Sequence, residues 1–298
     1  MPSESRQWRG TTGGGKFGQK FLFCFFRFFK VTVLYPVLVF VIPFYLLFAV
    51  KGRKAVYSYF HDILGYGKCK AFRATAKNYY VFGKVVLDKF AMQSGKTAQF
   101  HIHIENEDAF QSMLDNNKGF VIVSSHVGNF ELAGHCLSQN KKPFYSVMFG
   151  AETEVMLQHR EQSLQRTHIN LIPIADDMSH LFAIKEALEK GGVVTILCDR
   201  LMGGNKKKKV DFLGKEAYFP LGTFILAAHT NSDMVCVFTM KEKKLNYTTY
   251  IFPLDVDEQE QSINKRAENM LKQYVKYLEE IVRKYPEQWF NYYDFWKI

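Results

Sequence analysis

A chain of 298 residues is long enough for one large α/β domain or two small ones. Its 47% hydrophobic content excludes disorder, and 23% charged residues with a mean hydropathy of −0.16 exclude a membrane protein with several spans. The net charge of +10 is local, because residues 1–100 hold 16 Lys and Arg against 3 Asp and Glu. This basic third is also the most apolar, so we expect it to meet an anionic membrane surface and not nucleic acid.

Residues 1–55 are predicted to anchor the chain to a membrane. Val31–Val50 is a run of 20 residues without charge, which as a helix is about 30 Å long, the thickness of a hydrocarbon core. Pro36 and Pro43 interrupt such a helix, and basic residues flank it on both sides. A single spanning helix and a re-entrant or interfacial hairpin fit equally well. A cleaved signal peptide and a buried soluble helix fit less well.

Residues 56–298 are predicted to form the catalytic domain. Within it, residues 56–100 are expected to form basic helices that lie along the membrane. After residue 100, short β-rich runs alternate with amphipathic segments, which predicts an α/β fold with a mostly parallel mixed sheet flanked by helices. The expected strands are Phe100–Ile104, Gly119–Ser124, Phe144–Met148, Ile169–Pro173, Val193–Cys198, Met234–Met240 and Tyr247–Phe252. The expected helices are Glu107–Asn116, Asn129–Gln139, Glu152–Arg166, Ser179–Lys190, Leu221–His229 and Ser262–Lys284.

The densest chemical signal is the segment Ser124–Glu131, directly after the apolar strand Phe120–Val123. Groups beyond the carboxyl ends of strands collect in the active crevice of open α/β sheets, which favours a functional His126. Glu131, five residues later, is placed to accept a hydrogen bond from one imidazole nitrogen, so that His126 acts as a general base. The alternative is a helix-capping histidine and a glutamate paired with a surface lysine. No G-x-S-x-G elbow is present, so the sequence supports no serine nucleophile.

Four blocks together resemble the bacterial lipid A biosynthesis acyltransferases, the lauroyl and myristoyl transferase branch of the lysophospholipid acyltransferase-like superfamily. The blocks are KGFVIVSSHVGNFELAG at 118–134, KGGVVTILCDR at 190–200, VDFLGKEAYFPLGT at 210–223 and YPEQWFNYYDFW at 285–296. Their order and spacing agree with the family over almost the whole chain. The resemblance implies a glycerol-3-phosphate acyltransferase-like fold. It also implies transfer of a fatty acyl chain from acyl-carrier protein, or from acyl-CoA, to a hydroxyl of a membrane lipid.

The resemblance implies His126 and Glu131 as the catalytic pair, with no metal and no cofactor. Supporting or substrate-binding roles are expected for seven further residues: Gly128, Asn129, Arg160, Asp199, Arg200, Pro220 and Gly222. We expect the backbone N–H groups near Gly128 and Asn129 to stabilise the oxyanion, and Asn129 is also a candidate N-cap.

Arg160 matches an arginine that the family keeps near the site, and an Arg160–Asp199 pair is expected unless that contact is an ordinary structural ion pair. Pro220 and Gly222 belong to a block that shapes the acceptor or acyl pocket.

Two departures from the family pattern concern the acceptor. Arg200 replaces the glutamine that is common after the aspartate, and the tail ends in Tyr-Tyr-Asp-Phe-Trp where the family has a basic run. Arg200 adds a fork that suits phosphate or carboxylate groups. The run Lys206, Lys207, Lys208 and Lys209 is expected on a loop near the site, where it contacts the carrier protein or a lipid headgroup unless it is merely solvated.

Metal binding and disulfides are not expected. The five cysteines are scattered without a C-x-x-C pair, which favours a reducing compartment, and His101 and His103 share one strand face without a third ligand nearby. Together with the predicted anchor, the resemblance implies a location at the inner membrane of a bacterium, with the catalytic domain facing the cytoplasm, and we expect a monomer. The alternatives are a nucleic-acid-binding protein that uses the basic segment, a lipid hydrolase, and a lipid-binding homologue without catalysis.

Overall fold

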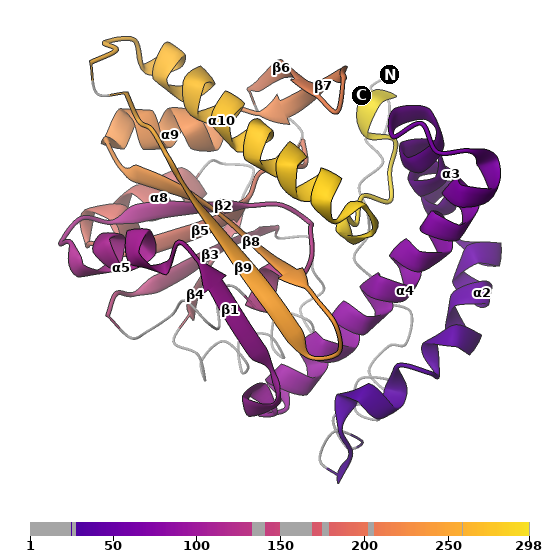
Figure 1. Cartoon of the computed structure of the whole chain (residues 1–298). Coiled ribbons are helices and arrows are strands. Elements are labelled where there is room, and N and C mark those ends of the chain that lie inside the picture. The colour runs from indigo at the N-terminus through magenta and orange to yellow at the C-terminus, as the bar shows by residue number, and fades with distance from the viewer. Residues whose placement is uncertain are drawn as a thin grey trace.

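The computed structural model describes residue 25 and residues 28–132, 141–149, 169–174, 179–201, 206–257 and 259–297. Its centre is a seven-stranded sheet in the order β1-β9-β8-β2-β5-β3-β4 (Figure 1). All neighbours in this sheet are parallel except β8 and β9, which are antiparallel. The predicted mostly parallel mixed sheet is thus confirmed. The seven strands are β1 His101–Glu105, β2 Phe120–Ser124, β3 Phe144–Phe149, β4 Ile169–Ile174, β5 Val193–Leu197, β8 Asp233–Lys241 and β9 Asn246–Leu254.

Helices cover both faces of the sheet because the side chains of the central strand β2 alternate between two apolar layers. Phe120 and Ile122 pack with residues of α5 on one face. Val121 and Val123 belong to the larger core on the other face, with α8, α9 and α10. These helices span Glu107–Asp115 (α5), Ser179–Glu189 (α8), Gly222–Thr230 (α9) and Ile263–Lys284 (α10). The strands and these four helices lie within one or two residues of their predicted positions, whereas most of the other two predicted helices, Asn129–Gln139 and Glu152–Arg166, lies outside the described residues.

One element was not predicted from the sequence. β6 Lys207–Phe212 and β7 Lys215–Pro220 form a separate antiparallel hairpin, which contains most of the lysine run that we expected on a loop. Exposed and less exposed side chains alternate along β6, so that Val210 and Lys208 turn inward between solvent-facing neighbours. A run of lysines hides this period of two, because their long side chains suit either environment at the edge of a sheet.

Of the two anchors that were expected, the single spanning helix over Val31–Val50 is not found in the described structure. The segment is broken into a 3-10 turn at Val31–Leu34, the helix α2 at Leu38–Phe48 and the start of α3, Val50–Ser58. Pro36 separates the first two elements, as expected of a residue without a backbone N–H. α2 has 11 residues, about 16 Å at 1.5 Å per residue, roughly half of a hydrocarbon core. Among the residues that the structure describes, none of the helices is long and apolar enough to cross a membrane.

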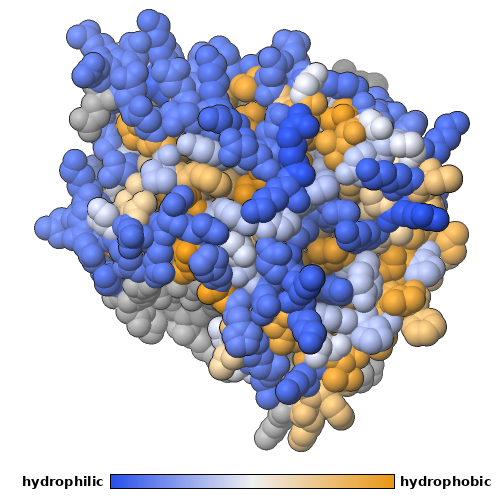
Figure 2. Space-filling view, in the orientation of Figure 1, coloured by the Kyte–Doolittle hydropathy of each residue, from blue (hydrophilic) through white to orange (hydrophobic). Residues whose placement is uncertain are grey.

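α2 packs along α4, a helix of 26 residues at Lys68–Gln93 that takes up much of the predicted basic region (Figure 1). Leu38 and Ile42 are the buried residues of α2. The opposite face of α2 leaves large apolar side chains in solvent, and Figure 2 shows apolar residues gathered where α2 lies. They include Phe40 at 82%, Phe44 at 60% and Phe48 at 69% exposed.

A buried ion pair joins the N-terminal region to the sheet. Lys241, on β8, places its Nζ 2.5 Å from Oδ2 of Asp88 on α4, and their side chains are 4% and 0% exposed. The hydroxyls of Tyr35 and Tyr247 both donate to the same carboxylate. Burial raises the pKa of Asp88 and lowers that of Lys241, while the attraction between the two groups opposes both shifts. Each buried charge is therefore stabilised by its partner, which takes the place of water.

Replacing Lys241 by methionine is expected to lower the free energy of unfolding by about 3–5 kcal/mol, because Asp88 then stays buried without its counter-ion. Urea unfolding followed by circular dichroism measures this loss. The matched control is Lys77→Met, which breaks the pair of a lysine that is 61% exposed with Glu287. That change is expected to have little effect. Equal losses in the two variants would contradict the role given to the buried pair.

Candidate active site

His126 and Asp199 meet because they follow neighbouring parallel strands in register. Ser124, the last residue of β2, pairs with Leu197, the last residue of β5. The segment after each strand continues for two residues past the same edge of the sheet, to His126 and to Asp199. The backbone N–H of Cys198 still donates to the carbonyl of Ser124 at 2.9 Å. The carboxyl ends of parallel strands are where open α/β sheets bind their ligands. This edge is therefore the candidate active site.

Asp199 holds His126 by two hydrogen bonds. Nδ1 of the imidazole lies 2.7 Å from Oδ1 of Asp199, and the backbone N–H of His126 donates to Oδ2 at 2.9 Å. The carboxylate is 2% exposed and the imidazole 19% exposed, so the pair has a closed side and an open side. Because a carboxylate accepts, Nδ1 carries the hydrogen and Nε2 has the free lone pair. The geometry suits a general base that acts through Nε2.

The charges of the pair are set by burial and by one neighbouring cation. Burial lowers the pKa of His126 below its ordinary value of 6.5, the guanidinium of Arg200 lowers it further, and Asp199 opposes both. For Asp199, burial alone would raise the pKa, but His126 and Arg200 together hold it below its usual value. At neutral pH the imidazole is thus unprotonated and the carboxylate ionised, which is the state that a general base requires.

The carboxylate on Nδ1 is not the one predicted. Glu131 was expected to accept from the imidazole, but the structure gives that place to Asp199 and pairs Oε1 of Glu131 with Nζ of Lys89 at 2.6 Å. The local spacing indicated Glu131, whereas the register of β2 and β5 decides for Asp199. The other predicted partner of Asp199, Arg160, lies outside the described residues.

Oxyanion stabilisation was predicted for the backbone N–H groups near Gly128 and Asn129, and those of these two residues donate to backbone carbonyls. That of Gly128 donates to the carbonyl of Gln288 at 2.9 Å, and that of Asn129 donates to the carbonyl of Thr239 at 2.7 Å. These two N–H groups therefore have backbone partners in this structure. Gly128 instead serves the turn, because its φ is +51° and a Cβ there would lie 2.1 Å from the carbonyl oxygen of Thr239. Asn129 is confirmed as an N-cap, since its Oδ1 accepts from the N–H of Leu132 at 3.2 Å.

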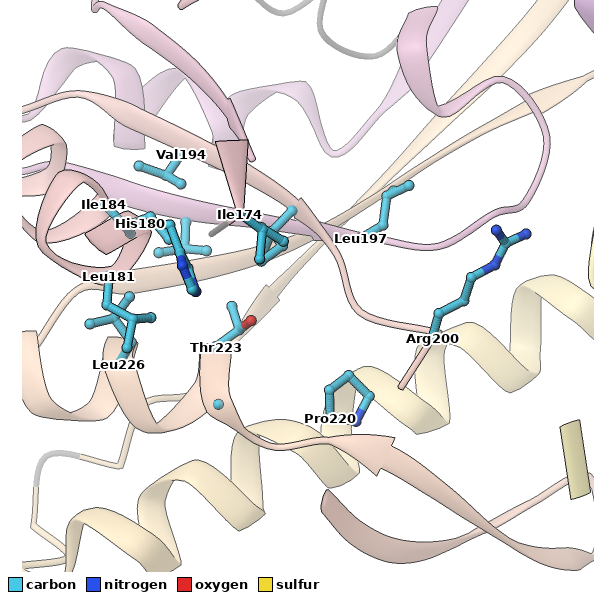
Figure 3. Close-up of a pocket in the computed structure, with 13 residues that line it drawn as sticks. Ile174, His180, Leu181, Ile184, Val194, Leu197, Arg200, Pro220, Thr223 and Leu226 are labelled. Atoms are coloured by element: carbon cyan, nitrogen blue, oxygen red, sulfur yellow. The ribbon is translucent and has the colours of Figure 1, made fainter. Parts of the chain in front are cut away.

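An apolar pocket lies between the sheet and the helices α8 and α9 (Figure 3). Its walls come from β2, β4, β5, α8 and α9, and Arg200, Pro220 and Gly222 are among its lining residues. Figure 3 shows His180, Leu181 and Ile184 at one end and Arg200 at the other. The apolar lining residues are Val121, Ile174, Leu181, Ile184, Val194, Ile196, Leu197, Pro220 and Leu226. Three of the predicted supporting residues therefore line one pocket that begins beside Asp199.

The lysine run lies on the hairpin and is partly neutralised. Lys208 pairs with Glu268 of α10 at 2.7 Å, and Lys209 pairs with Glu216 across the hairpin at 2.8 Å. Nζ of Lys207 lies 4.5 Å from the ring centroid of Tyr218. Within the part of the chain that the structure describes, no cluster of His, Cys, Asp or Glu has the composition of a metal site.

The part that the C-terminal segment plays at the site was not predicted. Trp289 was noted only as part of the block at 285–296, but its indole N–H donates to Oδ2 of Asp199 at 3.4 Å. The backbone of Phe290 donates to the carbonyl of His126 at 2.8 Å and accepts from Nη2 of Arg200 at 3.3 Å. The motif at 285–296 was visible, but nothing in its composition indicated which loop it contacts.

The class of protein to which this site belongs is given by comparison with known proteins. Residues 74–298 match the family of the bacterial lipid A biosynthesis acyltransferase. The chain belongs to this family. A phosphatidylinositol mannoside acyltransferase of Mycolicibacterium smegmatis is 24% identical over 163 residues, which are 54% of this chain and 53% of that relative. The chain thus spans about half the length of the curated relative that it matches.

Proposed function

We propose that this acyltransferase moves a fatty acyl chain from acyl-carrier protein to a hydroxyl of a membrane lipid, with a lipid A precursor as the acceptor. The observation that carries the proposal is the His126–Asp199 pair, whose closed side is buried and whose neighbour Arg200 lines an apolar pocket. A base beside an apolar pocket suits a reaction in which a hydrocarbon chain must be held while a hydroxyl loses its proton. Membership of the family supports the lipid A acceptor.

The pair accounts for the proton transfers of such a reaction. Nε2 of His126 takes the proton of the acceptor hydroxyl as its oxygen attacks the thioester carbonyl carbon. Asp199, bonded to Nδ1, stabilises the imidazolium that forms. When the tetrahedral intermediate collapses, the C–S bond breaks and the leaving thiolate takes the proton back from Nε2. The protein forms no covalent bond with the acyl group in this route.

Arg200 supplies positive charge to the same place. It lines the pocket, and its guanidinium contributes to the lowered pKa of His126, so its charge acts on the imidazole. The N–H groups of Gly128 and Asn129 already donate to backbone carbonyls. We therefore assign Arg200 to stabilise the developing oxyanion. Its Nη2 bond to the carbonyl of Phe290 fixes the side chain in place.

The remaining predicted residues are proposed to act around this centre. Glu131, held by Lys89, is proposed to contribute to the site as the second carboxylate of the family motif. The pocket lined by Pro220 and Gly222 is proposed to receive part of the acyl chain, because most of its lining residues are apolar. The hairpin lysines Lys206–Lys209 are proposed to meet the acidic carrier protein.

Transfer by the purified protein tests the proposal. With a fatty acyl-carrier protein and a lipid A precursor, mass spectrometry is expected to show a product heavier by one acyl group. Parallel reactions with acyl-CoA, and with a phosphatidylinositol mannoside in place of the lipid A precursor, distinguish donors and acceptors. Product on another lipid alone would overturn the lipid A acceptor and keep the acyltransferase. Unchanged lipids in every reaction, and in cells that lack the protein, would overturn the whole proposal.

We also propose that α2 docks the enzyme on the cytoplasmic face of a bacterial inner membrane without crossing it. The exposed face of α2 carries Phe40, Phe44 and Phe48, and the basic residues Lys51 and Lys54 follow directly. Apolar rings next to cations are the combination that binds an anionic lipid interface. The helices up to residue 100 continue this surface with exposed basic side chains, which are Lys68, Lys70, Arg73 and Lys77.

Replacing Phe40, Phe44 and Phe48 together by serine is expected to reduce binding to anionic vesicles at least tenfold, because the apolar area that enters the interface is lost. Cosedimentation with vesicles measures the bound fraction. The control is Phe182→Ser, which removes a ring that is 76% exposed on α8, on the other side of the molecule (Figure 1). If the triple variant sediments like the unmodified protein, α2 is not the docking surface.

A further inference from the structure

The C-terminal segment Pro286–Phe290 runs antiparallel to the loop that carries His126. Val127 and Trp289 form an isolated β-bridge. It is bracketed by two hydrogen bonds, from the N–H of Gly128 to the carbonyl of Gln288 at 2.9 Å and from the N–H of Phe290 to the carbonyl of His126 at 2.8 Å. The loop after β2 is therefore held on this side by backbone of the tail, 160 residues later in the chain.

The tail itself is anchored at several points away from His126. Nδ2 of Asn78, on α4, donates to the carbonyls of Glu287 and Trp289 at 3.1 and 2.9 Å. The side chain of Gln288 makes two bonds to the backbone of Lys241, accepting from its N–H at 2.9 Å and donating to its carbonyl at 2.7 Å. These contacts fix the tail to both α4 and β8. The bonds of Asn78 and Gln288 hold the tail in one position beside the His126 loop.

The indole of Trp289 reaches the catalytic carboxylate from this support. It is 1% exposed and packs edge to face against four aromatic rings, those of Tyr59, Phe212, Phe295 and Trp296. Its Nε1–H donates to Oδ2 of Asp199 at 3.4 Å, the same oxygen that accepts from the backbone of His126. Two N–H donors thus hold Oδ2, which leaves Oδ1 for Nδ1 of the imidazole.

We propose that Trp289 is a positioning residue that orients Asp199, and through it the imidazole of His126, by this N–H donation. The inference rests on the proposed role of His126 as the base. A carboxylate with one oxygen fixed cannot rotate away from Nδ1, and the shared hydrogen bonds disperse its negative charge. Trp289 touches neither substrate in this arrangement, because it lies on the buried side of Asp199.

The groups that act on this pair come from several elements. Arg200 follows Asp199 directly, the hydroxyl of Tyr293 donates to the Asp199 carbonyl at 3.2 Å, and the charge of Asp199 also reaches Tyr274 of α10 and Cys198. None of these changes when the indole N–H alone is removed. Loss of that N–H leaves Oδ2 less firmly held, so that Asp199 bonds Nδ1 for less of the time and stabilises the imidazolium of His126 less. The pKa of His126 then falls.

Trp289→Phe removes the N–H and keeps an aromatic ring in the buried position. We expect kcat to fall about 10–100-fold, as for other partners that orient a catalytic group, with KM for both substrates unchanged. The acidic limb of the pH profile of kcat/KM is expected to move to lower pH. Trp296→Phe is the matched control, because this indole lies in the same aromatic cluster and its N–H has no hydrogen-bond partner among the described residues. The control is expected to keep its pH profile.

An NMR measurement on the unmodified protein tests the same contact without acyl transfer and without the need for Trp289→Phe to fold. The chain has three tryptophans, so the indole ¹⁵N–¹H signals are few. One signal is expected to titrate with His126 and to lose that titration in His126→Ala, while the Trp296 signal does not move. No titrating indole, or equal losses of kcat in the two tryptophan variants with no shift of the acidic limb, would overturn the proposal. An unmodified protein that transfers no acyl group would contradict the proposed function, and the indole titration would still decide the contact.

Discussion

Replacing His126 with alanine is expected to lower kcat of acyl transfer by about 10²–10⁴-fold, the usual contribution of a general base. Without the imidazole the acceptor hydroxyl has no group to take its proton, and the leaving thiolate has none to return it. Initial rates with a saturating acyl donor measure the loss. The imidazole edge is 19% exposed, so the variant is expected to stay folded and to sediment with vesicles as before. Undiminished transfer by the alanine variant would contradict the proposed mechanism.

The pH profile of the unmodified enzyme gives the same base a second test. Burial and Arg200 hold the pKa of His126 below 6.5, and only the unprotonated imidazole can accept a proton. kcat/KM is therefore expected to rise as the pH rises through that pKa, so that the midpoint of the acidic limb lies below pH 6.5. An acidic limb centred above 6.5 would show that another group, or a differently solvated histidine, governs the reaction.

Replacing Asp199 with asparagine is expected to lower kcat by on the order of 10³–10⁴-fold, because it selects the wrong tautomer of His126, as when an amide replaces the carboxylate of a catalytic triad. The position of Oδ2 accepts from two N–H donors, the His126 backbone and the Trp289 indole. The amide oxygen of asparagine takes that position and turns its NH₂ group towards Nδ1. Nδ1 must then accept, so that Nε2 carries the hydrogen and cannot act as a base.

Glu131→Gln is the comparison that separates the two carboxylates. Glu131 pairs with Lys89 and not with Nδ1 in this structure, so its amide variant is expected to lose about tenfold or less, in line with a partly exposed ion pair. The same rate assay measures both variants, and thermal unfolding controls for stability. A severe loss in Glu131→Gln together with a mild one in Asp199→Asn would return the orienting role to Glu131.

Local pattern was sufficient for most of the fold. Apolar runs of β-branched residues placed the seven sheet strands, and a period of 3.6 placed α5, α8, α9 and α10, because each element buries one face or both against the same core. The local sequence pattern did not predict the observed elements in two places, each for a physical reason. The lysines of β6 mask its alternation. The 20 uncharged residues at Val31–Val50 allowed one long spanning helix, but Pro36 ends the first element there and α4 packs against the buried face of the next.

For the active site, the sequence by itself determined which residues carry the chemistry, and the tertiary structure decided how they are paired. His126 and Asp199 each follow an apolar strand, which is readable from the chain alone. Three sets of contacts depend on the tertiary structure: the register of β2 with β5, the bonds from the N–H groups of Gly128 and Asn129 to Gln288 and Thr239, and the bond from Trp289 to Asp199. They join residues 73 to 160 positions apart in the chain. Hydrogen-bond partners are fixed by position in space, and spacing along the chain predicts them only within one turn or one strand. Glu131 looked like the partner of His126 because it is near in sequence, and Asp199 is the partner because parallel strands end at a common edge.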